Sequence, residues 1–217
     1  MSPHIFKYWL AAFLSFSTAY IVIRGISPFD LDWIIKSIPI FLLMVLCQQS
    51  LTGNTRKTML LALGFSVTGD ILLSLNGYFI FGLGSFLIAQ LIYAAFFFTQ
   101  FKFSTRGLTW ALFIISLLST AGYFILPKSG DLSFVVVLYM IAISSMAIGA
   151  GFRQSNQFLL IALGALIFIS SDTLIAINKF VYEFSAAGVL IMTTYYLAQL
   201  MITLGVIRHS KQYSDLS

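Results

Sequence analysis

The chain has 217 residues, of which 59% are hydrophobic and only 9% charged, and its formal net charge is +5. An ordinary soluble domain is about one quarter charged, so this composition excludes a soluble globular protein. The Lys and Arg residues are scattered singly between apolar runs and form no basic patch, so we expect no nucleic-acid partner. Cys47 is the only cysteine, which excludes an intrachain disulfide and a multi-cysteine metal site.

Apolar runs of about 20 residues follow one another along the chain, and this is the length of a membrane-spanning helix. None of them alternates with the period of two that is typical of barrel strands. We therefore predict an all-α polytopic membrane helix bundle of about eight transmembrane helices, which forms a single integral membrane domain over residues 1–217. In chain order, the predicted spans cover residues 8–23, 31–47, 58–75, 79–100, 108–126, 134–151, 157–177 and 185–207.

Turn-forming residues separate several of the predicted spans. The first span shows no convincing small-residue cleavage site at its end, so we interpret it as a retained helix and not as a signal peptide. The predicted breaks lie at Ser27-Pro28, Gly53-Asn54, Asn76-Gly77, residues 127–130 and residues 154–156.

Eight spans place both termini on the same side of the membrane. The opposite side then holds three basic residues, Arg24, Lys128 and Lys179, while Lys36 lies inside a span. The positive-inside rule therefore predicts that both termini are cytoplasmic, in the inner membrane if the protein is bacterial. The basic residues on the side of the termini are Lys7, Arg56, Lys57, Lys102, Arg106, Arg153, Arg208 and Lys211.

Two segments of the sequence, residues 69–76 and 171–178, resemble each other. Asp70 and Asp172 stand in identical register in the two segments, and so do Asn76 and Asn178. An Ala-Gln-Leu tripeptide follows each segment one span later. Since both segments start from the same side of the membrane, we predict a parallel four-plus-four internal duplication.

Apart from Asp32 at the start of the second span, the charged residues inside the predicted spans are Asp70, Asp172 and Lys36. A charge within a bilayer costs several kcal/mol, so each of the three is a candidate for function. Counted along the helices, all three fall in the non-cytoplasmic half of the bilayer. Lys36 has a second interpretation, because it can pair with Asp32 one turn earlier or extend to the interface. The two aspartates are harder to explain as packing residues.

Polar residues also form a stripe on the last predicted span. Tyr195, Gln199 and Thr203 follow at intervals of four residues, so they share one helix face that is turned toward other helices, and Tyr196 stands beside them. Gln199 and Gln90 have an alternative interpretation as ordinary hydrogen-bonding links between helices.

Four segments of the sequence are similar to the lysoplasmalogenase family of eight-helix membrane hydrolases, found in bacteria and animals. The likeness extends from about Lys36 to Ile207, and Pro39 and Tyr93 also fit the family pattern. One departure is Gln90, which stands where family members often carry His; because an amide cannot shuttle protons, we assign it no acid–base role. The matching segments are residues 65–70, 81–86, 171–176 and 192–200.

The resemblance implies that the protein hydrolyses the vinyl ether bond of a lysoplasmalogen, a lysophospholipid of the membrane. The products are a fatty aldehyde and glycerophosphoethanolamine or glycerophosphocholine. The resemblance also implies that Asp70 and Asp172 are the catalytic pair. The implied site-lining residues are Lys36, Tyr195, Tyr196 and Gln199, to which we add Asn76 and Asn178 of the repeated motif as substrate-binding candidates.

Two buried carboxyls suit this chemistry, which needs a proton for the alkene carbon, stabilisation of an oxocarbenium-like cation, and activation of a water molecule. Glycosidases meet the same needs with one protonated and one ionised carboxyl, so we expect no metal and no cofactor. We expect Asp70 and Asp172 to face a common cavity that opens toward the non-cytoplasmic leaflet. The alternative is a small proton-coupled transporter, although its acids would be expected near the midplane.

Overall fold

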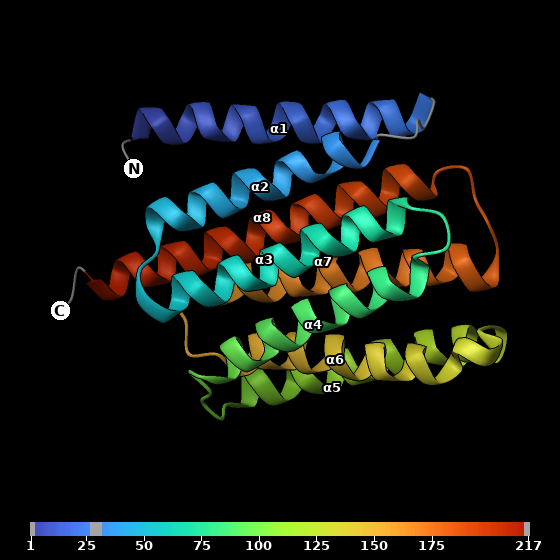
Figure 1. Ribbon diagram of the computed structural model, residues 1–217. Coiled ribbons are helices and arrows are strands. Elements are labelled where there is room, and N and C mark those ends of the chain that lie inside the picture. Colours follow the sequence, from blue (N-terminus) through green and yellow to red (C-terminus); the bar gives the residue numbers. More distant parts are fainter. Residues whose placement is uncertain (1–2, 27–31, 215–217) are drawn as a thin grey trace. The chain divides into compact units, whose positions relative to one another are not determined.

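The computed structural model of the protein describes residues 3–26 and 32–214 (Figure 1). Within these residues the main elements are eight α-helices, each long and apolar enough to cross a membrane, which confirms the predicted fold class of an integral multi-pass membrane protein. The break at Ser27-Pro28 and the predicted start of the second span at Leu31 lie outside the described residues. The helices are α1 (Pro3–Ile26), α2 (Asp32–Ser50), α3 (Gly53–Ser74), α4 (Phe79–Phe98), α5 (Thr105–Ile125), α6 (Ser133–Phe152), α7 (Phe158–Ala176) and α8 (Ala187–Ser214).

Several helices extend beyond the apolar runs that predict them. The helix α3 begins at Gly53 and not at residue 58, and α8 continues to Ser214 and not to residue 207. Hydropathy marks only the part of a helix that lies in hydrocarbon, whereas backbone hydrogen bonding continues through the flanking polar residues. The structure therefore corrects the boundaries of these spans without changing their number.

The connections after α3 and after α5 contain predicted turn residues, whereas Gly53 and Asn54, predicted as a break, are the first two residues of α3. Gly77 lies in the turn after α3 with a φ of 84°, a conformation that glycine adopts without steric cost. Two short 3-10 helices, η1 (Leu126–Lys128) and η2 (Gly130–Leu132), join α5 to α6. After α7 the chain continues into one π-helical turn, η3 (Ile177–Val181), which therefore follows the second copy of the repeated motif.

The chain divides into two compact units, residues 1–89 and residues 90–217. Unit 1 contains α1, α2, α3 and the first half of α4, and α2 packs against both α1 and α3. Ser85 on α4 donates a hydrogen bond of 2.7 Å to the carbonyl oxygen of Phe65 on α3. On the same two helices Gly69 allows the Phe86 ring to approach closely, because a Cβ atom at residue 69 would lie 2.5 Å from the ring.

Unit 2 contains the second half of α4 and the helices α5 to α8. Consecutive helices in this unit pack against each other, from α5 with α6 to α7 with α8. The Trp110 indole donates a hydrogen bond of 2.9 Å to the carbonyl oxygen of Ala147, which joins α5 to α6. Gly164 of α7 lies so close to Ile202 of α8 that a Cβ atom there would meet it at 2.9 Å. Close approach at small residues is typical of helix packing in membranes.

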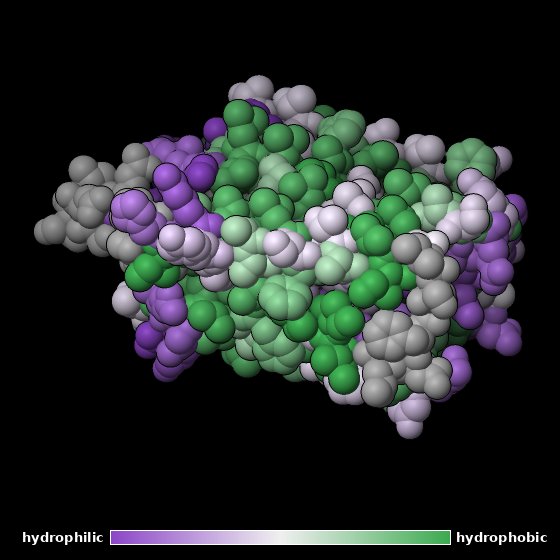
Figure 2. Space-filling model, turned by 90° about the horizontal axis from the view of Figure 1, so that it is seen from above, coloured by the Kyte–Doolittle hydropathy of each residue, from purple (hydrophilic) through white to green (hydrophobic). Residues whose placement is uncertain are grey.

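Apolar side chains cover the outer surface of the helices. On the face shown in Figure 2 they form a broad area across the middle, and hydrophilic side chains gather toward the two ends. The exposed large residues include Phe81, Leu112 and Tyr123, which are 65%, 60% and 77% exposed. A surface of this composition is suited to contact with lipid chains.

A buried arginine links the end of α6 to the end of α4 within unit 2. Arg153, directly after α6, is 3% exposed, and its Nη1 donates a hydrogen bond of 2.8 Å to the carbonyl oxygen of Phe96 in the last turn of α4. Its guanidinium also lies over the Phe96 ring, 4.3 Å from the centroid. Burial lowers the pKa of Arg153 to about 10, so the side chain is still a cation at neutral pH. A cation at this position is favoured by the negative end of the helix dipole.

Candidate active site

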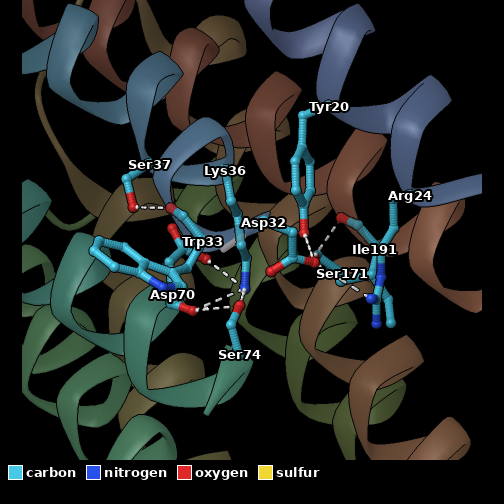
Figure 3. Close-up of polar contacts among 10 residues, drawn as sticks. All are labelled: Tyr20, Arg24, Asp32, Trp33, Lys36, Ser37, Asp70, Ser74, Ser171 and Ile191. Carbon is cyan, nitrogen blue, oxygen red and sulfur yellow. Dashed lines mark hydrogen bonds and ion pairs between the residues drawn. The ribbon is translucent and has the colours of Figure 1, made fainter. Parts of the chain in front are cut away.

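Asp70 lies on α3 in unit 1 and is almost completely buried, with 2% of its surface exposed. Lys36 of α2 reaches it, with Nζ 3.4 Å from the carboxyl oxygen Oδ1 (Figure 3). The same ammonium donates a hydrogen bond of 3.0 Å to the backbone carbonyl oxygen of Asp70. Since Lys36 is itself 7% exposed, the two charges form a buried ion pair within unit 1.

Ser74 completes this arrangement one turn after Asp70. Its hydroxyl donates a hydrogen bond of 3.1 Å to the carbonyl oxygen of Asp70 and accepts one of 3.4 Å from Lys36. The carbonyl oxygen of Asp70 therefore accepts hydrogen bonds from both side chains, as Figure 3 shows. The lysine is held at Asp70 by three groups of the same helix, and this fixes its position.

Asp32 has partners on α1. Its Oδ2 lies 3.4 Å from Nη1 of Arg24 and accepts a hydrogen bond of 3.4 Å from the hydroxyl of Tyr20 (Figure 3). In the structure Asp32, one turn before Lys36, is thus paired with residues of α1, and Lys36 pairs with Asp70 on α3. The interpretation of Lys36 as a partner of Asp32 is not the one that the structure adopts.

Asp172 lies on α7 in unit 2, where two neutral side chains contact its Oδ2 atom. The hydroxyl of Tyr139 on α6 donates a hydrogen bond of 2.5 Å to this oxygen. The amide Nε2 of Gln90 on α4 donates a longer one of 3.5 Å. Tyr139 is 8% exposed and Gln90 is fully buried. Asp172 stands four residues before the last residue of α7, as Asp70 does in α3.

The polar stripe on α8 faces inward, as the sequence predicts. Tyr195, Tyr196, Gln199 and Thr203 are all buried, with at most 3% of their surface exposed. The Oε1 atom of Gln199 accepts a hydrogen bond of 2.9 Å from the Tyr93 hydroxyl on α4, so this glutamine links α8 to α4 within unit 2. The interpretation of Gln199 as a link between helices therefore has a partner in the structure.

The two asparagines of the repeated motif occupy different surroundings. Asn76 is exposed in the turn after α3. Asn178 lies within η3, and its Oδ1 accepts a hydrogen bond of 3.2 Å from the backbone N–H of Phe184. The difference arises because α3 ends at Ser74, whereas the helical backbone after α7 continues through η3. Asn178 thus stabilises its own loop, and a substrate contact for either asparagine stays a prediction.

Tyr139 is the residue of this site that the sequence analysis does not identify. It belongs to a long apolar span, where a tyrosine is usually interpreted as a packing or interface residue. A signal was nevertheless present, because a tyrosine hydroxyl away from the membrane surface needs a hydrogen-bond partner. Among the described residues, no group of three His, Cys, Asp or Glu side chains is placed to hold a metal ion.

Comparison with known proteins places the chain in a family. The bovine (Bos taurus) lysoplasmalogenase TMEM86A is 30% identical over 206 residues, which cover 87% of this chain and 83% of that protein. The human (Homo sapiens) TMEM86A is 31% identical over 83% of this chain and 80% of its own length. A lysoplasmalogenase of Mycobacterium bovis is 32% identical over 70% of this chain and 61% of its own. No solved structure matches the chain. Residues 31–206 match the YhhN family, and the chain therefore belongs to that family.

Proposed function

We propose that this protein is a lysoplasmalogenase, an integral membrane enzyme that hydrolyses the vinyl ether bond of lysoplasmalogens. The main support is the 30% identity to the bovine lysoplasmalogenase over most of both chains. The products are a fatty aldehyde and glycerophosphoethanolamine or glycerophosphocholine. The names of the relatives favour this function over a proton-coupled transporter, which intramembrane aspartates alone would also fit.

The reaction consumes one water molecule and needs one acid and one base. The acid donates a proton to the alkene carbon that is distant from the ether oxygen, and the positive charge moves to the carbon that bears the oxygen. The base takes a proton from water while the water oxygen bonds to that carbon. In the resulting hemiacetal the hydroxyl gives its proton to the carboxylate left by the first step, and the carbon–oxygen bond to glycerol breaks. The glycerol oxygen takes the proton held by the second carboxyl and leaves as an alcohol, and the remaining fragment is the aldehyde.

Asp70 and Asp172 are the acid and the base in this proposal. Both lie in helices that are long and apolar enough to cross the membrane, and each has hydrogen-bonding or charged partners that fix its carboxyl. A carboxyl pair can serve a reaction with oxocarbenium character, as glycosidases show. Tyr195, Tyr196 and Gln199 supply buried surface for the substrate near its polar part.

The termini are cytoplasmic in this proposal, because eight spans with the observed distribution of Lys and Arg satisfy the positive-inside rule. The two aspartates lie near the helix ends that face the opposite side, four residues from the end of α3 and α7. The lipid substrate then enters from the non-cytoplasmic leaflet, with its alkenyl chain among the apolar helices.

The test is the release of aldehyde by purified protein in detergent or proteoliposomes. Three lysolipids with the same head group are compared, which carry a vinyl ether, a saturated alkyl ether or an acyl chain. Only the vinyl ether has an alkene carbon that accepts a proton, so we expect aldehyde from this substrate alone. Fatty acid release from the acyl lipid, or proton flux in proteoliposomes without aldehyde, would contradict the proposal.

A further inference from the structure

Tyr139 and Asp172 form a short side-chain hydrogen bond within unit 2. The distance between Tyr139 Oη and Asp172 Oδ2 is 2.5 Å, at the short limit for an O–H···O bond. The bond joins the middle of α6 to α7, and Tyr139 is 8% exposed. An interaction of this length restricts where the carboxyl can lie.

Gln90 is a second donor to the same carboxyl. Its Nε2 lies 3.5 Å from the same carboxyl oxygen. An amide NH₂ group can only donate, whereas a hydroxyl has one proton and can also accept. The hydroxyl of Tyr139 gives its own proton to the same oxygen of Asp172. Two donors then fix Oδ2 of the carboxyl.

The position of Tyr139 in the sequence is also informative. Tyr139 precedes Asp172 by 33 residues, and Lys36 precedes Asp70 by 34. In both cases the residue lies on the helix before the one that bears the aspartate. Within the predicted duplication, Tyr139 thus lies one residue after the position that corresponds to Lys36 in the first copy.

We propose that Tyr139 is a positioning residue, which holds the Asp172 carboxyl in the orientation that turnover requires. This inference rests on the proposed vinyl ether hydrolysis. The terminal torsion of an aspartate is broad and roughly two-fold, so a carboxyl without such a donor samples many orientations. Proton transfer requires the carboxyl and the reacting atom to stay in hydrogen-bonding geometry, and a displacement of about 1 Å can cost a hundredfold in rate.

Tyr139→Phe removes the hydroxyl and keeps the ring, and Tyr123→Phe is the matched control because Tyr123 is 77% exposed on α5. We expect kcat for the vinyl ether substrate to fall about tenfold to a hundredfold in Tyr139→Phe, with KM nearly unchanged. The control keeps wild-type kcat. Gln90→Leu, which removes the orienting amide, lowers kcat by about threefold to tenfold.

An infrared measurement separates positioning from a purely structural role. The carboxyl stretching band of Asp172 is assigned by its loss in Asp172→Asn. We expect this band to shift in Tyr139→Phe and to stay unchanged in Tyr123→Phe, because only the first substitution removes a donor to the carboxyl. The band is read on folded protein, as judged by a single gel-filtration peak in detergent, and does not depend on activity. Should Tyr139→Phe fail to fold, the same band and kcat are measured in Gln90→Leu.

The outcomes distinguish the inference from the function on which it rests. An active wild type together with unchanged kcat or an unshifted band in Tyr139→Phe would overturn the positioning role alone. A loss of stability with kcat and KM unchanged per folded molecule would do the same, since it assigns Tyr139 to packing. A wild type that releases no aldehyde would overturn the proposed function itself.

Discussion

Lys36→Met tests the buried ion pair of unit 1, because it removes the cation while keeping the length of the side chain. The side chains of Lys36 and Asp70 are only 9% and 3% exposed, so solvent screens their interaction weakly. Removal of one partner from a buried pair leaves the other charge uncompensated and costs about 3–5 kcal/mol. We therefore expect Lys36→Met to lower the free energy of unfolding by about that amount.

The assay is reversible unfolding in mixed micelles with an increasing fraction of SDS, followed by tryptophan fluorescence. Lys57→Met is the control, since Lys57 is exposed in the first turn of α3 and a surface change of this kind alters stability by at most about 0.5 kcal/mol. The double variant Lys36→Met/Asp70→Asn contains neither charge, so it should recover most of the loss. Equal stability of Lys36→Met and wild type, or no recovery in the double variant, would refute the ion pair as a structural element.

Three further predictions concern the site and its supporting helices. Asp70→Asn and Asp172→Asn should each abolish turnover through kcat, because Asn can neither donate a carboxyl proton nor act as a base. Asp70→Asn also leaves the Lys36 cation without its carboxylate, so kcat is measured per folded molecule. Near-normal kcat in either variant would remove that residue from the mechanism. A cysteine introduced at Asp172, which is only partly buried, should react with an impermeant thiol reagent from the non-cytoplasmic side of oriented vesicles, and reaction only from the cytoplasmic side would reverse the proposed orientation. Gly69→Ala should lower the free energy of unfolding by about 1–3 kcal/mol, since a Cβ atom there would lie 2.5 Å from the Phe86 ring. Gly64→Ala is the control and should be neutral or slightly stabilising, because a Cβ atom at residue 64 has no other atom within 4 Å. Equal effects of the two substitutions in the same unfolding assay would contradict this packing.

The number and order of the helices can be predicted from the sequence because the bilayer imposes a simple rule. Every span must supply about 20 apolar residues and satisfy its own backbone, so hydropathy alone identifies it. The ends of α3 and α8 could not be predicted in this way, since residues outside hydrocarbon carry no hydropathy signal. Their polar residues continue the helix by backbone hydrogen bonds, which composition does not record.

The candidate site was only partly predictable, and for a different reason. Asp70, Asp172 and Lys36 stand out because a charge within an apolar span is costly, so the sequence marks them individually. The pairing of Lys36 with Asp70, and not with Asp32, depends on which helix faces the lysine. Tyr139 gave only a weak signal, because a tyrosine is common in membrane helices and its partner on α7 is distant in sequence.

The two similar segments differ in the charge that lies beside the aspartate. A residue on the preceding helix contacts the aspartate in both, 34 residues earlier in unit 1 and 33 residues earlier in unit 2. In unit 1 that residue is a cation, and in unit 2 it is a neutral hydroxyl. At a distance of 3 to 4 Å in a medium of low dielectric constant, a full charge acts on a carboxyl far more strongly than a neutral dipole does. Two identical carboxyls would compete for the same role, whereas an acid–base reaction needs two carboxyls in different surroundings. In the proposed mechanism, the cation beside Asp70 and the neutral hydroxyl beside Asp172 would therefore give the two aspartates the different surroundings that two distinct proton transfers need.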